Sequence, residues 1–145
     1  MIEFSIVLNV ASALLFIVAI FGVVFGLQYL VLAPLEGEVF GVTESQVRAF
    51  NPSLLDKITL IHRFDGLYML SLSLAFCFIS LVPFRKGEKW AWYLTLGIFG
   101  LALVGQVILT YMGANVLAEF YLPASILLVI LWIVGLVLPV KEFFS

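Results

Sequence analysis

Three ionisable side chains lie close together at the start of an otherwise apolar stretch. The segment IHRFDG, residues 61–66, contains Arg63, Asp65 and His62, the last being the single histidine of the chain. A histidine and an aspartate three residues apart share one face of a helix, and Glu119 could complete a small metal site with them. Metal-binding helical bundles use several histidine and carboxylate ligands. We therefore predict no metal site, no other cofactor and no catalytic residue in this segment.

Other polar side chains are predicted to lie near the same end of the molecule. Gln28 lies towards the end of the first apolar segment, Gln106 lies in the second half of the third, and the fourth begins with further polar residues. Isolated polar groups are costly in lipid, so we expect these side chains to face one another between the helices. The predicted polar cluster consists of Gln28, His62, Arg63, Asp65, Gln106, Asn115 and Glu119.

Glu119 is expected about one turn inside its helix, where a carboxylate needs a counter-charge, a proton or water. One interpretation pairs it with Arg63 or His62 across the bundle. The other places it at the start of the helix, facing the lipid headgroups and stabilised by the helix dipole. Both interpretations agree with the sequence.

The composition predicts that lipid surrounds the chain. Of the 145 residues, 64% are hydrophobic and 11% are charged, whereas a soluble domain is about half apolar and about a quarter charged. Charge-free segments of about 20 residues, enough for a helix to cross a bilayer, recur along the sequence. We predict an all-α fold, a four-helix transmembrane bundle that forms a single integral membrane domain over residues 1–145. Its helices are expected at about 4–33, 58–84, 90–111 and 116–138, with the segment MGAN, residues 112–115, as the break before the last helix.

The predicted outer loop between the first two helices, residues 34–57, contains two signals for short helices. The segment TESQ, residues 43–46, has the pattern of a capping box. Asn51 followed by Pro52 is a second helix-start signal, because proline fits the first helical turn. The second helix could therefore begin near Pro52 and project from the bilayer. Short elements of this kind more often lie on the membrane interface, which is the arrangement that we expect.

Basic residues predict the orientation in the membrane. Arg85, Lys86 and Lys89 lie in the short link between the second and third helices, and Lys141 follows the fourth. Short loops rich in lysine and arginine remain in the cytoplasm. We therefore expect a multi-pass protein of the cell membrane, with both termini cytoplasmic and the polar cluster on the outer side.

Glycines are predicted to let the helices pack closely. Gly22 and Gly26 form a small-xxx-small pair in the first helix, and Gly97, Gly100 and Gly105 lie in the third. Such residues serve contacts within a chain or contacts between subunits, and we favour the former.

The turn PFRKGEKWAWYLTL, residues 83–96, is preceded by the segments HRFDGLYMLSLSL and GVTESQVRAFNPSLLDKI. This combination resembles a group of small prokaryotic four-helix integral membrane proteins. The resemblance implies the four-helix layout, and it transfers no site because the group has no assigned activity. Small multidrug transporters also have four helices, but they need a glutamate within the first helix, where this chain has none.

The sequence contains no phosphate-binding glycine loop, no nucleophile motif and no patch suited to nucleic acid. No charged residue lies in the middle of a predicted helix, which argues against an ion-coupled carrier. We therefore expect a non-catalytic accessory or structural subunit of a membrane complex. Its partners would be the lipid bilayer and either a second copy or a larger complex, and no nucleic acid. The alternative is a lipid- or small-molecule-binding protein, or an enzyme, with an outward-facing polar pocket between the helices.

Overall fold

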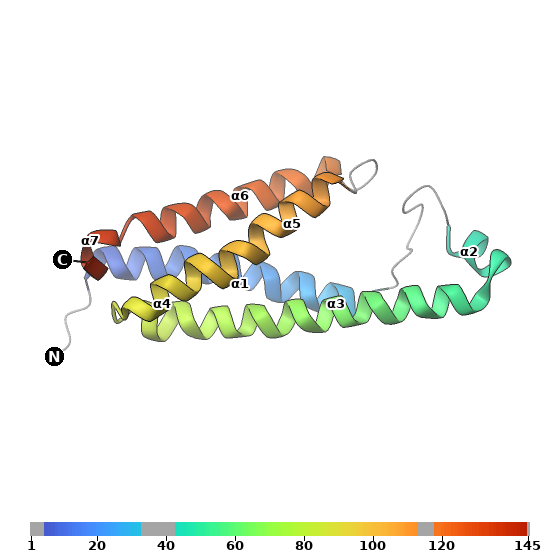
Figure 1. Cartoon of the computed structure of the whole chain (residues 1–145), viewed down its shortest axis with the longest axis horizontal. Helices are drawn as coiled ribbons and strands as arrows, with labels where there is room; N and C mark the ends of the chain where they lie inside the picture. Colours follow the sequence, from blue (N-terminus) through green and yellow to red (C-terminus); the bar gives the residue numbers. More distant parts are fainter. Residues whose placement is uncertain (1–4, 33–42, 113–117, 145) are drawn as a thin grey trace.

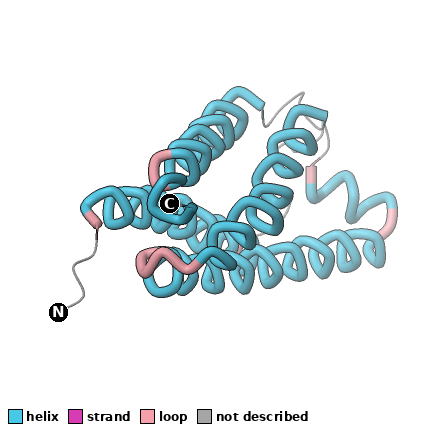
Figure 2. The backbone as a smooth tube through the Cα atoms, turned by 60° about the vertical axis from the view of Figure 1, so that its left-hand side comes forward, coloured by secondary structure: helices cyan, strands magenta, loops and turns pink. Residues whose placement is uncertain are grey.

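A computed structural model of the chain describes residues 5–32, 43–112 and 118–144, in which every regular element is helical (Figure 2). Three helical segments are long and apolar enough to cross a membrane: Ile6–Val31, Pro52–Phe84 and Lys89–Ile108. The predicted all-α fold is thereby confirmed, and the structure is compatible with a multi-pass membrane protein. The predicted fourth helix, 116–138, coincides with α6 (Ala118–Val137), in which Leu122–Val137 is apolar.

The second of these segments is longer than predicted. It consists of α3 (Pro52–Ile79) followed by a π-helical turn, η1 (Ser80–Phe84). The side chain of Asn51 accepts a hydrogen bond from the backbone N–H of Ser53 at 3.0 Å, so the helix begins at Pro52 and not at the predicted residue 58. Satisfying a free N–H at the first turn is what allows a helix to start there.

The third segment is one continuous helical stretch of three parts. These are α4 (Lys89–Leu94), the π-helical turn η2 (Thr95–Phe99) and α5 (Gly100–Met112). The turn that connects it to η1 contains Gly87, whose φ of 73° is a left-handed conformation that glycine adopts without a steric penalty.

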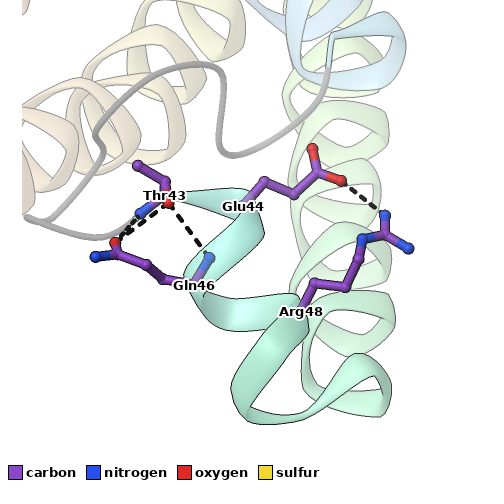
Figure 3. Close-up of polar contacts among 4 residues, drawn as sticks. All are labelled: Thr43, Glu44, Gln46 and Arg48. Carbon is purple, nitrogen blue, oxygen red and sulfur yellow. Dashed lines mark hydrogen bonds and ion pairs between the residues drawn. The ribbon is translucent and has the colours of Figure 1, made fainter.

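The short helix α2 (Glu44–Phe50) precedes α3 and packs back against it. Its predicted capping box is present: Thr43 Oγ1 accepts from the N–H of Gln46 at 3.3 Å, and Gln46 Oε1 accepts from the N–H of Thr43 at 2.7 Å (Figure 3). Arg48 pairs with Glu44 at 2.7 Å one turn away. Leu55 of α3 is buried where α2 packs. We call α2 together with residues 52–65 of α3 the arm.

Both chain termini and the turn at residues 85–88 lie at one end of the molecule, which we call the terminal end (Figure 1). At the other end, the arm end, α3 runs past the neighbouring helices towards α2. The buried core gathers towards the terminal end. There the rings of Phe84 and Phe143, the latter from α7 (Val140–Phe144), have centroids 4.9 Å apart. Trp132 Nε1 donates to the carbonyl of Thr95 at 3.1 Å and so connects α6 to η2.

Helices α1 and α3 run side by side in opposite directions and approach very closely (Figure 1). A Cβ atom added to Gly26 would lie 2.7 Å from the backbone nitrogen of Leu70, and one added to Gly66 would lie 3.0 Å from the carbonyl oxygen of Gly26. Further along, the Ser12 hydroxyl donates to the carbonyl of Ser80. Small residues thus line this contact along its length.

The glycines that were predicted to serve helix packing differ in how closely other atoms approach them. Gly22 and Gly26 lie against α3, and Gly100 lies against the ring of Trp132. A Cβ atom added to Gly97 or Gly105 would have no heavy atom within 4 Å among the described residues. Close packing therefore involves only part of the predicted glycine set.

Candidate functional site

The stacked side chains of Tyr29 and His62 form the centre of the polar region at the arm end. Tyr29 lies near the end of α1 and His62 in the arm part of α3, and their ring centroids are 4.3 Å apart with an interplanar angle of 18°. A Cβ atom on Gly66, one turn after His62, would lie 2.9 Å from Cβ of Tyr29. The absence of a side chain at Gly66 therefore makes room for Tyr29, whose ring then reaches the imidazole. Both rings are half-buried.

Three other members of the predicted cluster lie close in sequence to the two stacked residues. Gln28 precedes Tyr29 in α1, and Arg63 and Asp65 follow His62 in α3; all three are exposed. Among the residues that the structure describes, neither Arg63 nor Asp65 forms a hydrogen bond or an ion pair. These side chains are thus available to a ligand or to lipid headgroups.

The remaining members come from other elements. Gln106 is exposed on α5. Asn115 and the side chain of Glu119 lie outside the described residues, as does most of the predicted MGAN break. The expected contact between Glu119 and Arg63 or His62 stays a prediction.

The chemistry open to this region is binding by stacking, hydrogen bonds and charge. The described residues contain no group of three histidine, cysteine or carboxylate side chains that could hold a metal ion. A stacked imidazole beside an exposed amide, a guanidinium and a carboxylate can recognise a polar headgroup or a partner side chain.

A second set of polar side chains lies towards the terminal end. Arg85 Nε donates to Asn9 Oδ1 at 2.6 Å, which joins the start of α1 to the turn after η1. The hydroxyl of Thr95 is buried without a hydrogen-bond partner in the described part of the chain. The Asn9–Arg85 pair could have been found from the sequence, because antiparallel neighbours bring the start of one helix to the end of the next.

Comparison with known proteins adds no functional information. The chain matches no protein-family model, and comparison with curated protein sequences and with solved structures finds no significant match.

Proposed function

We propose that the chain is a four-pass protein of the cell membrane with both termini in the cytoplasm. The position of both termini and of the 85–88 turn at one end supports an even number of crossings. Arg85, Lys86, Lys89 and Lys141 are exposed at this terminal end, and short basic loops remain in the cytoplasm. In this orientation the arm lies on the outer side.

We further propose that the protein is a non-catalytic accessory subunit whose arm binds a partner in a membrane complex. The observation that carries this proposal is the length of the helix Pro52–Phe84. Its 33 residues span about 50 Å, whereas the hydrocarbon layer is about 30 Å thick. A tilt of more than about 50° would be needed to keep the whole helix inside, beyond the usual range of about 0–40°. The first turns of α3 therefore lie outside the hydrocarbon layer.

The arm has the properties of a preformed binding element. The capping box stabilises the start of α2, and α2 packs against α3, in which Leu55 is buried, so the two helices already have a fixed relative position. A preorganised surface loses less conformational entropy on binding than a flexible loop. Phe50 is the last residue of α2 and is 83% exposed, with Arg48 and Lys57 also exposed nearby in the sequence. A protruding aromatic side chain among charged groups is typical of the anchor residues of protein interfaces.

Native mass spectrometry of the protein extracted from its own membranes in mild detergent tests this function. We expect a complex with a different protein at fixed stoichiometry, and at least tenfold less of it after Phe50→Ala. The matched control is Leu101→Ala on α5, another exposed apolar residue, which should leave the complex intact. Absence of any different protein, or equal recovery with Phe50→Ala, would contradict the proposal.

A second candidate function is binding of a lipid or small molecule in the polar region at the arm end. The Tyr29–His62 stack favours it, because it holds an imidazole half-buried beside exposed polar groups. The same mass spectra separate the two functions. A tightly bound small molecule that is lost from His62→Ala, in a protein without partners, would support the second.

A further inference from the structure

The face of α3 that packs on α1 has a regular pattern in the sequence. Small residues recur there at every seventh position: Gly66, Ser73 and Ser80. The matching residues of α1, namely Ser12, Ala19 and Gly26, are also seven apart, and all six are buried. A seven-residue repeat is the spacing found in helices that wind around each other. We call this side of α3, which also includes His62 and the arm residue Leu55, the paired face.

Another side of α3 carries a second repeat of the same period. Leucine stands at every seventh position: Leu60, Leu67, Leu74 and Leu81. Phe64, Ser71 and Phe78 lie between these leucines, each four residues after one leucine and three residues before the next. All seven side chains are exposed. We call this side of α3 the open face.

Contact with lipid does not explain this pattern. Lipid tails require apolar side chains but no fixed spacing, and in a straight helix a seven-residue repeat drifts by about 20° per heptad. The open face also extends outside the membrane. The charge-free part of α3 and η1 begins at Gly66, whereas Leu60 and Phe64 lie beyond Asp65, in the arm. Apolar side chains in the arm gain free energy when another protein surface covers them.

We propose that the open face of α3 binds the open face of α3 from a second copy of the chain, as a parallel two-helix coiled coil. Copies of one protein insert in the same orientation, so their α3 helices run parallel and a twofold axis can relate them. A parallel pair places each leucine opposite its own counterpart. The leucines occupy the d positions of the heptad, where leucine is preferred in parallel dimers.

Side chains in and beside the repeat fit such a pair. Ser71 and Ala75 are small and exposed within the charge-free part of α3, so they leave room for the larger side chains of a facing helix. The Ser71 hydroxyl donates to the carbonyl of Leu67 at 2.8 Å, so its polar group is satisfied within its own helix. In a parallel coil, Arg63 flanks the contact beside Tyr68 of the second copy, which avoids a like-charge pair and allows a cation–π contact.

Disulfide formation along α3 tests the proposal in the membrane. Single cysteines are introduced at each position from 67 to 78 in a Cys77→Ser background, with position 77 itself represented by the native cysteine. Membranes from expressing cells are then oxidised, and dimers are read on a non-reducing gel. We expect yields that peak at 67, 71, 74 and 78 and exceed those at 69, 73 and 76 by at least tenfold. Leu101→Cys on α5 is the control for random collision, because it is 77% exposed but lies on another helix.

The outcomes decide between the possible occupants of the open face. Yields as low as the Leu101→Cys control at every position would mean that lipid covers this face and would overturn the proposal. Cross-links to a chain of different mass would also overturn it. A second measurement does not depend on added cysteines: native mass spectrometry should show a dimer, and Leu67→Ala combined with Leu74→Ala should raise its dissociation constant at least tenfold. These results are independent of the proposed function, which concerns Phe50 and a different protein.

Discussion

The paired face and the open face of α3 both repeat every seven residues, but their side chains differ in size. The paired face consists mainly of small residues, and α1 covers it so closely that a Cβ atom on Gly66 would lie 2.9 Å from the backbone of Leu30. Beyond the end of α1, α2 packs back on α3 where Leu55 is buried. The open face consists of leucine and phenylalanine and is exposed from Leu60 to Leu81.

This difference shows how one helix can take part in two kinds of contact. In lipid no hydrophobic driving force holds helices together, so close backbone approach through small residues supplies the van der Waals contact. Large side chains prevent such an approach and instead interlock as knobs into holes. Substitutions on the paired face should therefore affect folding of the single chain, whereas those on the open face should affect only association.

The largest effect on stability is expected for Gly26→Ala, in the part of α1 that packs on the paired face of α3. The new Cβ atom would lie 2.7 Å from the backbone nitrogen of Leu70, which cannot move without displacing the helix. Overpacking of this kind lowers the free energy of unfolding by about 1–3 kcal/mol. Thermal or steric-trapping unfolding in detergent measures it. Gly105→Ala is the control, since its Cβ meets no described atom within 4 Å, and equal stability of the two variants would disprove close packing at Gly26.

An intermediate and local effect is expected for Thr43→Ala, which acts where α2 packs on the paired face. Loss of the cap leaves the N–H of Gln46 without its partner and weakens α2 by about 1 kcal/mol. Hydrogen exchange should increase in residues 44–50 and near Leu55, and should be unchanged in α1. Ser53→Ala is the control, because Asn51 bonds the backbone N–H of Ser53 and not its side chain. An unchanged exchange rate in α2 would show that the capping box does not hold the arm.

The smallest effect on folding is expected for Leu74→Ala on the open face. This side chain is 54% exposed in the single chain, and substitutions at exposed positions change stability by less than about 0.5 kcal/mol. Unfolding of the monomer at high detergent-to-protein ratio should therefore be nearly unchanged. A loss comparable to that of Gly26→Ala would mean that Leu74 is buried within one chain, contrary to the description of the open face.

The sequence was sufficient to predict the helical fold, the capping box and the helix-start signal at Asn51, because each depends on neighbouring residues. The second helix nevertheless begins at Pro52 and not at about residue 58, because the start signal at Asn51 prevails over the usual tendency of such short elements to lie on the membrane interface. The partner of His62 could not be predicted. It depends on the register of α1 against α3, which Gly26 and Gly66 determine through close approach and not through a local pattern.

The most direct test concerns the central claim that α3 crosses the bilayer and projects on its outer side. Single cysteines at Ser53, Leu72 and Lys86, in a Cys77→Ser background, are exposed to a membrane-impermeant maleimide on intact cells and after permeabilisation. The account predicts that Ser53→Cys reacts on intact cells, that Lys86→Cys reacts only after permeabilisation, and that Leu72→Cys stays protected in both. Reaction of Lys86→Cys on intact cells, or reaction of Ser53→Cys and Lys86→Cys from the same side, would contradict it.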